Sequence, residues 1–489
     1  MNKKTSYIPL IIITLAHLMA VLDNTVMVVA LPSIQQGLAI PAADRQWIIT
    51  AYTLAYAGLL LLGGKLADRF GANRTLLVGV AGFALASAVG GAAQTGWMLI
   101  AARAVEGCFG AVLTSSTKTL LALTYTDGQQ RARAMGVFSA TLALGGVLGM
   151  VLGGFLTAAL SWRWCLYINL PLSVLVLAGS AKYLPRLATK PQVHINILDA
   201  LIFCAAIIAL VFGLGQAASD GWTSPVVLSS LAACILFAAL FILKQARGKN
   251  PLFPLRIITQ RHRAGAFLSM IFNSFGTLGL MLVLTFQLQS QQGASPLTTG
   301  LAMMPLMAVV VVISALVVPK LIPRVAPGLL IFGGLLFSAL GLLPLVWLPH
   351  TAHLWPLIIT SELLEGIGTG LGSAPAMHTS LLGVLPQDVG IASSTSSAAS
   401  QIGSSLGAAL LNTLTISAAS AAAATTPLLS AQQGYASACG WGCLILMVAA
   451  FIVIAMIRLS KPQPMSEPSS LSDQPQAGQP KSGQATANE

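Results

Sequence analysis

The sequence predicts an all-α membrane protein with 14 transmembrane helices, on the basis of three observations. Of the 489 residues, 56% are hydrophobic and only 8% are charged, whereas soluble globular domains carry about 25% charged residues. Apolar runs of about 20 residues, the length that crosses a bilayer, recur along most of the chain. Lys and Arg are concentrated in the segments between alternate runs. The composition therefore excludes a soluble enzyme, a soluble nucleic-acid-binding protein and a disordered protein.

The predicted spans follow one another with short loops between them. The first begins after Lys4 and continues past Asp23 to Pro32. Because it lacks an A-x-A cleavage site, we interpret it as a retained helix and not as a signal peptide. An even number of spans places both termini on the same side of the membrane. The spans are expected at residues 8–32, 46–66, 74–94, 97–122, 133–158, 162–184, 196–217, 224–245, 264–289, 297–319, 327–348, 353–382, 389–418 and 436–459.

The positions of Lys and Arg support this count. With the N-terminus in the cytoplasm, 21 of the 25 Lys and Arg residues fall in cytoplasmic segments. Arg45 and Arg163 lie outside, and Arg103 and Lys118 lie within a span. Cytoplasmic loops of membrane proteins are enriched in Lys and Arg, and a count wrong by one helix would scatter these residues between the two sides. The net charge of +12 therefore reflects membrane topology and requires no nucleic-acid partner.

The spans divide into two six-helix halves with an insert between them. Residues 1–184 are expected to form the N-terminal half, and residues 247–460 the C-terminal half. A polar cytoplasmic linker at 185–195 and two inserted helices at 196–246 connect them. Residues 461–489 are rich in Pro, Ser, Gln and Gly, which predicts a disordered cytoplasmic tail.

The loop after the second span contains a recognisable motif. It reads GKLADRFGANR from Gly64 to Arg74, and Gly71 suits a tight turn between two helices. This motif resembles the loop signature G-x-L-a-D-R-x-G-r-[RK] of the major facilitator superfamily, although Ala72 and Asn73 occupy positions where a basic residue is common. The resemblance implies a conformational latch made by Gly64, Asp68, Arg69, Gly71 and Arg74.

Four further stretches resemble one branch of this superfamily, the 14-span drug:proton antiporters. They are LDNTVMVVALP from Leu22, RAVEG from Arg103, WRWCLYINLP from Trp162, and GGVLGMVLGG from Gly145. The resemblance implies two six-helix bundles that rock about a central site, with two inserted helices. In the last stretch Met150 replaces the motif's proline.

The glycines of that last stretch leave one helix face smooth, so that another helix can approach closely. Ordinary helix packing is the alternative to an antiporter-specific role. The glycines concerned are Gly145, Gly149, Gly153 and Gly154.

Charged residues within the spans are candidate site residues, because each costs about 2.5–3.5 kcal/mol at a helix centre. With a helical rise of about 1.5 Å per residue, Asp23 in span one lies at a similar depth to Arg103 and Glu106 in span four. We expect these three side chains to form one cluster in the N-terminal half that takes part in proton coupling and substrate binding. A buried ion pair that only joins the two helices is the alternative.

Glu362 and Glu365 form a second candidate site near the middle of span twelve. Their i, i+3 spacing predicts a shared helix face, and two neighbouring carboxylates in a low-dielectric site do not readily ionise together. A carboxylate that binds either a proton or a cationic substrate would produce antiport. The alternative is that one Glu only faces a water-filled gap. Four glycines follow and suit a flexible or closely packed helix: Gly366, Gly368, Gly370 and Gly372.

The remaining reactive residues predict neither a metal site nor a cofactor. The six Cys fall in apolar stretches without metal-ligand spacing, and no nucleophile–base pair is evident. We expect no catalytic residue and no cofactor, with the proton gradient as the energy source. Lys118, near the inner end of span four, is expected to extend its amine to the membrane interface.

The leading hypothesis is a proton-coupled exporter of hydrophobic, cationic drugs, biocides or dyes that works by alternating access. We expect a monomer in a bacterial inner membrane, whose partners are small-molecule substrates, protons and the lipid bilayer. A dedicated exporter of one metabolite or natural product is the alternative on the same fold. A membrane-embedded enzyme would need a catalytic pair, and a non-transporting sensor would need a soluble output domain.

Overall fold

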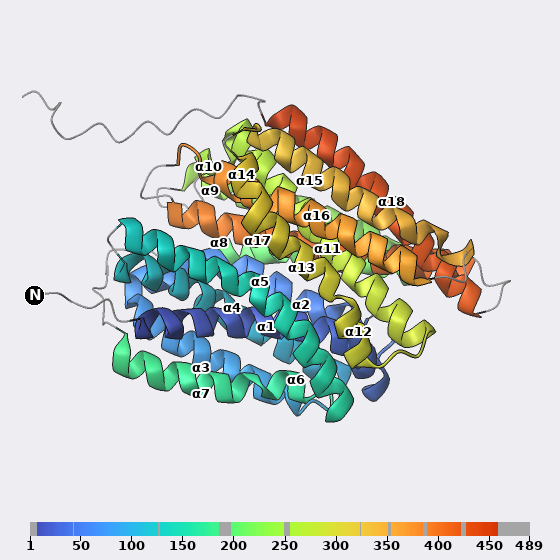
Figure 1. Cartoon of the computed structure of the whole chain (residues 1–489), viewed down its shortest axis with the longest axis horizontal. Helices are drawn as coiled ribbons and strands as arrows, with labels where there is room; N and C mark the ends of the chain where they lie inside the picture. The colour runs from blue at the N-terminus through green and yellow to red at the C-terminus, as the bar shows by residue number, and fades with distance from the viewer. Residues whose placement is uncertain are drawn as a thin grey trace, which may run out of the picture.

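The computed structural model is built from long helices that pack side by side in two groups, joined by connecting helices (Figure 1). Within the part of the chain that it describes, all regular structure is helical, which confirms the predicted fold class. The described residues are 7–42, 44–125, 128–184, 197–248, 255–322, 324–350, 354–384, 389–421 and 427–457.

The first group contains the helices that precede the linker. Helices α2 and α4 pack closely, as do α3 and α4, and α1 and α5. These helices are α1 (Ile8–Gly37), α2 (Trp47–Phe70), α3 (Ala72–Gly91), α4 (Gly96–Thr124), α5 (Gly128–Ala159), α6 (Trp164–Tyr167) and α7 (Asn169–Tyr183).

The second group contains the helices that follow the inserted pair α8 (Ile197–Asp220) and α9 (Pro225–Arg247). Helix α8 packs on α9 and also contacts α2 and α17, so the insert touches both groups. The second group consists of α10 (Arg256–Thr259), α11 (Arg261–Phe286), η1 (Gln287–Gln291), α12 (Pro296–Ala302), α13 (Met304–Val312), η2 (Ile313–Val317), α14 (Val318–Leu321), α15 (Pro327–Leu342), η3 (Leu343–His350), α16 (Leu354–Leu381), α17 (Val389–Ala421) and α18 (Pro427–Met456).

Several helix boundaries differ from the expected spans. Helix α1 continues through Pro32 to Gly37. Proline lacks an N–H group, so Pro32 removes one backbone hydrogen bond of the helix, and the other backbone hydrogen bonds keep the last turns helical. Helix α18 begins at Pro427, earlier than the expected start at 436, since proline suits the first helical turn. The tenth run is interrupted by the π-helical segment η2, a type of irregularity that is frequent at functional sites.

Length and composition allow most of these helical runs to cross a membrane. Over the described residues, eleven helices are long and apolar enough to do so. Helices α2 and α5 contribute shorter apolar stretches, Trp47–Leu60 and Leu148–Ala159. The count of 14 spans therefore stays a prediction, whereas the multi-pass character is established.

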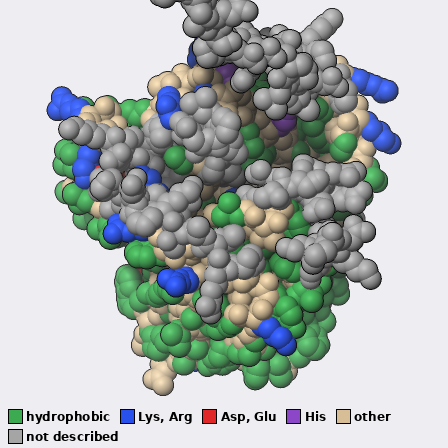
Figure 2. All heavy atoms as spheres, turned by 90° about the vertical axis from the view of Figure 1, so that its left-hand side faces the viewer, with side chains coloured by type: hydrophobic (Ala, Val, Ile, Leu, Met, Phe, Trp, Pro, Cys, Tyr) green, Lys and Arg blue, Asp and Glu red, His purple; other side chains and the backbone are tan. Residues whose placement is uncertain are grey.

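The ends of the helical assembly differ in charge. Lys and Arg side chains are scattered over the end at which α1 begins, and hydrophobic side chains surround it (Figure 2). We call this the basic end; Arg45 and Arg163 lie at the opposite end. The described residues that contribute to the basic end include Arg69, Arg74, Lys182, Lys244, Arg247 and Arg261.

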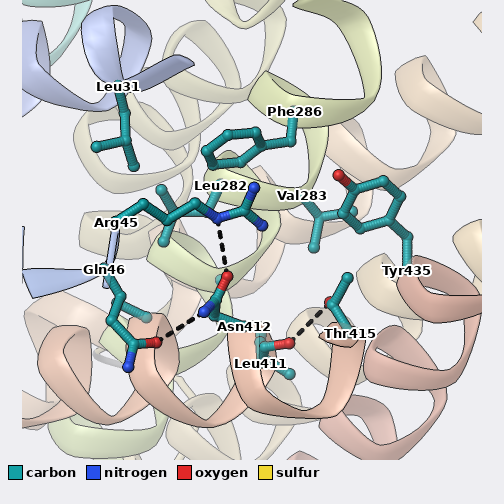
Figure 3. Close-up of a pocket in the computed structure, with 12 residues that line it drawn as sticks. Leu31, Arg45, Gln46, Leu282, Val283, Phe286, Leu411, Asn412, Thr415 and Tyr435 are labelled. Atoms are coloured by element: carbon teal, nitrogen blue, oxygen red, sulfur yellow. Dashed lines mark hydrogen bonds between the residues drawn. The ribbon is translucent and has the colours of Figure 1, made fainter. Parts of the chain in front are cut away.

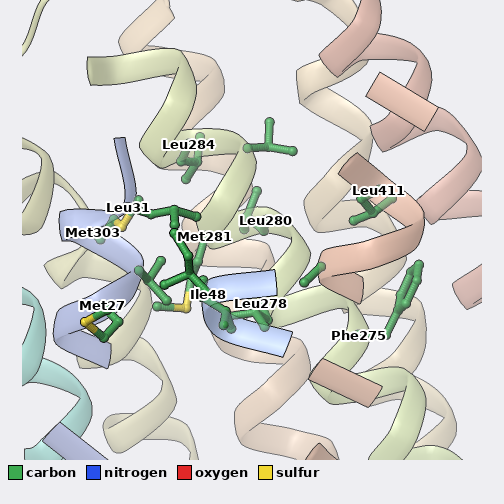
Figure 4. Packing of buried hydrophobic residues seen from close by; sticks show 14 of the residues in the cluster. Met27, Leu31, Ile48, Phe275, Leu278, Leu280, Met281, Leu284, Met303 and Leu411 are labelled. Carbon is green, nitrogen blue, oxygen red and sulfur yellow. The ribbon is translucent and has the colours of Figure 1, made fainter. Parts of the chain in front are cut away.

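A buried apolar cluster joins the two groups near the opposite end (Figure 4). Met27 and Leu31 of α1 lie beside Met281 and Leu284 of α11, and Ile48 of α2 belongs to the same cluster. All five side chains are buried. Apolar packing thus joins the two groups at this end.

Candidate functional site

The first polar cluster lies inside the N-terminal group and is centred on Arg103 of α4. Its Nη1 donates to Asp23 Oδ2 of α1 at 2.5 Å and to Glu106 Oε2 at 2.6 Å. Arg103 Nε also donates to the carbonyl oxygen of Ile48, and the guanidinium lies 4.3 Å from the centre of the Tyr52 ring. Asp23, Arg103 and Glu106 are each 0% exposed. The structure therefore brings the three predicted residues together as a fully buried network.

An amide and a hydroxyl complete this cluster. Asn169 Nδ2 at the start of α7 donates to Asp23 Oδ1 at 2.9 Å and to Ser87 Oγ of α3 at 2.9 Å. Ser87 Oγ in turn donates to the carbonyl oxygen of Leu166. Asp23 is consequently held by a cation on one oxygen and by an amide on the other. Arg103 Nη2 has no hydrogen-bond partner among the described residues.

The second polar cluster lies inside the C-terminal group around Glu365 of α16. Thr277 Oγ1 of α11 donates to Glu365 Oε1 at 2.7 Å, and Thr369 Oγ1 donates to the same oxygen at 3.2 Å. The two hydroxyl oxygens are 2.8 Å apart, and Asn273 Oδ1, at 3.0 Å, is a second acceptor within reach of the single proton of Thr369 Oγ1. A buried carboxylate is thus joined to α11 through hydroxyl groups.

Glu362 lies one turn earlier on α16 in different surroundings. Its side chain is buried beside the backbone of Leu306 in α13, yet neither carboxylate oxygen has a hydrogen-bond partner of normal geometry among the described residues. Three residues correspond to about 300° of helical rotation, so the i, i+3 pair is offset by about 60°. Glu365 therefore faces α11 and Glu362 faces α13, and the expected single face is divided between two neighbours.

The glycines of α16 allow it to pack closely on both sides. A Cβ atom at Gly368 would lie 2.5 Å from Ser338 N of α15, and one at Gly366 would lie 2.8 Å from the carbonyl oxygen of Leu306 in α13. Ser314 Oγ in the π-helical segment η2 donates to the carbonyl oxygen of Gly370. Of the two expectations for this stretch, close packing fits the geometry.

The glycines of α5 face two different helices. Cβ atoms at Gly145, Gly149 and Gly153 would meet Val21, Thr25 and Val26 of α1 respectively, which makes this a packing face within the N-terminal group.

Gly154 points elsewhere: a Cβ atom there would lie 2.6 Å from the carbonyl oxygen of Pro296 in α12. Helix α5 therefore uses one face to contact its own group and another to contact the C-terminal group.

The motif between α2 and α3 forms a one-residue turn at the basic end. Gly71 has φ of +89°, a conformation that glycine adopts without strain, as the sequence predicted. The side chains of Arg69 and Arg74 are exposed, and a side chain at Gly64 would meet nothing within 4 Å. The side chain of Asp68 lies outside the part of the chain that the structure describes. The latch role of these residues stays a prediction.

Lys118 differs from the expectation that its amine would extend to the membrane interface. Its Nζ donates to Ser397 Oγ of α17 at 2.7 Å, so it joins the two groups. The bond satisfies a charge that would otherwise be costly within a span. Sequence position alone places Lys118 near the inner end of α4, but it does not reveal which neighbouring helix supplies an acceptor.

The opposite end of the assembly is closed by contacts between the two groups (Figure 3). Arg45 Nε, in the loop after α1, donates to Asn412 Oδ1 of α17 at 3.0 Å, and its guanidinium lies 3.6 Å from the centre of the Phe286 ring. Asn412 Nδ2 donates to Gln46 Oε1 at 2.9 Å. These residues surround a cavity of about 20 Å³, room for a single water molecule.

Sequence reasoning did not identify several of these polar residues. Asn169 was recognised only as part of the INLP motif. A polar asparagine in an apolar run is the sequence feature that could have indicated a hydrogen-bond partner on another helix. The uncharged residues on α11, α16 and α17 lie in ordinary apolar runs and have no sequence signal. The missed residues are Arg45, Ser87, Asn273, Thr277, Thr369 and Asn412.

The chain is similar to several bacterial resistance and export proteins. It is 38% identical over 457 residues to the puromycin resistance protein pur8 of Streptomyces alboniger, which covers 92% of this chain and 90% of that protein. It is 35% identical to the cephamycin export protein CmcT of Amycolatopsis lactamdurans, over 84% of this chain and 85% of that protein. It is also 30% identical to the multidrug resistance protein Stp of Mycobacterium tuberculosis, over 84% of this chain and 76% of that protein.

Solved structures of transporters share the fold. A bacterial homologue of the human lysosomal transporter Spinster superposes with a TM-score of 0.65 at 18% identity, covering 94% of this chain and 98% of that chain. A peptide transporter solved with sulfate has a TM-score of 0.65 at 15% identity, with coverages of 93% and 96%. The family model described as Major Facilitator Superfamily matches residues 13–408. With this match and these relatives, the chain belongs to the Major Facilitator Superfamily, a family of multi-pass membrane transporters and not of enzymes.

Proposed function

We propose that this transporter exports hydrophobic, cationic compounds such as drugs, biocides or dyes in exchange for protons. The observation that carries the proposal is the burial of Glu362 and Glu365 in the middle of a helix that otherwise has no charged residue. Buried carboxylates favour the protonated form unless a cation or hydrogen-bond donors offset the loss of hydration. A cationic substrate and a proton therefore compete for such a site.

The buried network of Asp23, Arg103 and Glu106 supports the same proposal. Its formal charge is −1 when both carboxylates are ionised, so the N-terminal half also offers a site that a proton can neutralise. A purely structural ion pair would need only one acid for the arginine. We propose that this network responds to protonation and transmits the change to α1 and α4.

Alternating access would follow from rocking of the two halves about these sites. We propose residues 1–184 and 247–460 as the halves, the basic end as the cytoplasmic side, and both termini on that side. The contacts around Arg45 then close the outer side and must separate for release. The loop motif with Asp68 would act as a latch at the inner side, and the chain would act as a monomer in a bacterial inner membrane that requires no cofactor.

A second candidate is the export of a single natural product. Two of the similar proteins have names that refer to one compound, puromycin and cephamycin, whereas a third is called a multidrug resistance protein. Export of one metabolite uses the same fold and the same coupling chemistry. The breadth of the substrate range distinguishes the two candidates.

Everted membrane vesicles test both candidates. Vesicles that are acidic inside are mixed with ethidium, other cationic dyes, puromycin and neutral drugs, and a pH-sensitive fluorophore records loss of the gradient. Proton release with several unrelated cations, and its loss in Glu365→Gln, is the expected result. Release with one compound alone supports the dedicated exporter. No release with any compound, from correctly inserted protein, contradicts drug:proton antiport.

A further inference from the structure

Glu365 is fully buried, but the two threonines whose hydroxyl groups bind it are partly exposed residues. The carboxylate side chain is 0% exposed, whereas Thr277 and Thr369 are both partly exposed. Both hydroxyls donate to the same carboxylate oxygen, at 2.7 and 3.2 Å. The shortest polar connection between Glu365 and its surroundings therefore passes through Thr277 and Thr369.

Further polar groups lie next to this connection on the side of the basic end. On α16, Ser373 lies one turn beyond Thr369 in that direction and is exposed, and its Oγ donates to the carbonyl oxygen of Thr369 at 2.6 Å. Toward the opposite end, α11 is buried: Leu280 and Leu284 are at most 1% exposed. The polar groups next to the hydroxyl pair, Asn273 on α11 and Ser373 on α16, thus lie on its basic-end side.

Few charges compete for a proton at this position. The described helices α13, α15, α17 and α18, together with η2, contain no Asp, Glu, Lys or Arg. Of the other elements that pack on α16, α14 contains Lys320 and η3 ends at His350, and α16 itself contains His378, 13 residues beyond Glu365. The charged and titratable residues of α11 are Arg261, His262 and Arg263, in its first turn and several turns away. Glu362 on the same helix is the nearest other acid, and it faces α13. Proton exchange at Glu365 is therefore expected to depend on the hydroxyl groups around it.

We propose that the hydroxyls of Thr277 and Thr369 form the proton port of Glu365, through which this acid exchanges its proton with the basic-end side. This rests on the proposed proton-coupled transport. On release, the O–H bond of the Glu365 carboxyl breaks as its proton passes to a threonine oxygen. That threonine gives its own proton to water on the exposed side, and both hydroxyls are left donating to the carboxylate. Thr277 and Thr369 are positioning residues, because they act through Glu365.

The test follows the carboxyl proton directly and does not require a known substrate. Full-length protein in lipid vesicles is studied by infrared difference spectroscopy, and the carboxyl C=O band of Glu365 is identified by its loss in Glu365→Gln. After a switch from H₂O to D₂O, the rate at which this band shifts reports proton exchange. In Thr277→Val with Thr369→Val we expect exchange to be slower by about tenfold or more, the scale of a lost proton-transfer group.

Matched variants separate the port from a packing effect. Thr277→Ser with Thr369→Ser keeps both hydroxyls and should restore native exchange. Thr285→Val lies on the same helix, where the Thr285 hydroxyl bonds Met281 O of its own helix, and should leave exchange unchanged. Should the double valine variant fail to insert, each single valine variant is used in its place.

Two outcomes overturn the port. The first is a native rate of proton exchange in the valine variants. The second is a carboxyl C=O spectrum that Glu365→Gln leaves unaltered between about pH 5 and 9. That result would mean that Glu365 has no exchangeable proton. Failure of the transport proposal is a different result, namely the absence of substrate-induced proton release from vesicles of the native protein.

Discussion

The guanidinium of Arg45 lies 3.6 Å from the centre of the Phe286 ring, although the two residues belong to opposite halves of the sequence. The same arginine donates to Asn412, so one side chain from the loop after α1 contacts both α11 and α17. A cationic group placed over an aromatic ring and hydrogen-bonded on its edge is held firmly when it is largely shielded from water. The alternating access proposed above would require this contact to break.

Arg45→Gln is therefore expected to favour opening at this end. Loss of the cation–π contact and of a charged hydrogen bond removes about 2 kcal/mol, which increases the open population by more than about tenfold. Spin labels at the exposed residues Gln36 and Gln292 in a Cys-free background report the opening as a longer distance. Arg163→Gln is the control, because Arg163 donates to Ala93 O within its own half. Equal distances in both variants would show that Arg45 does not hold this end closed.

Arg103→Met is expected to destabilise the protein strongly. It leaves Asp23 and Glu106 buried without a cation, and breaking a buried ion pair on one side costs about 3–5 kcal/mol. Thermal unfolding followed by circular dichroism should show a lower Tm for this variant than for native protein. Adding Asp23→Asn and Glu106→Gln to it removes every charge and should recover most of the stability.

The same charge-free triple variant decides what the network does. If the charges serve proton coupling, the recovered protein still fails to export substrate from vesicles. Native export by the triple variant would mean that the network only joins α1 to α4. Thermal unfolding and export measured on this one variant thus distinguish a proton-coupling role of the cluster from a purely structural one.

Glu362 and Glu365 are expected to respond in opposite directions to replacement by methionine. Glu362→Met should raise the Tm, because both carboxylate oxygens are buried without partners and an apolar side chain removes that cost of about 1–3 kcal/mol. Glu365→Met should lower the Tm, since the hydroxyls of Thr277 and Thr369 lose the carboxylate oxygen to which both donate. Substrate-induced proton release should be lost in both. A lower Tm for Glu362→Met would contradict the assignment of an unpartnered acid at that position.

Gly153 and Gly154 are consecutive residues that contact different halves. A Cβ atom at Gly153 would lie 2.9 Å from the backbone of Val26, and one at Gly154 would lie 2.6 Å from Pro296 O. Overpacking costs about 1–3 kcal/mol. Gly153→Ala should therefore lower the Tm, whereas Gly154→Ala should lengthen the distance between the labels at Gln36 and Gln292. A Tm loss in Gly154→Ala without any change in label distance would count against α5 as a contact between the halves.

The sequence by itself determined the fold class, the family motifs and most of the charged site residues. Apolar length and the placement of Lys and Arg are local properties, so they predict spans without knowledge of packing. Helical rise placed Asp23 beside Arg103 and Glu106, because span one ends and span four begins at the same membrane surface. The positive φ at Gly71 was likewise predictable from a one-residue turn.

Only the tertiary structure decided which residues on distant helices meet. Helix rotation separated Glu362 from Glu365, and it turned Thr277 toward α16 and Asn169 toward Asp23. Lys118 reaches Ser397, 279 positions away in the sequence, instead of the membrane interface. An uncharged Thr or Asn in an apolar run has no distinctive pattern, and its role depends on the partner that packing of the two halves places within hydrogen-bond distance.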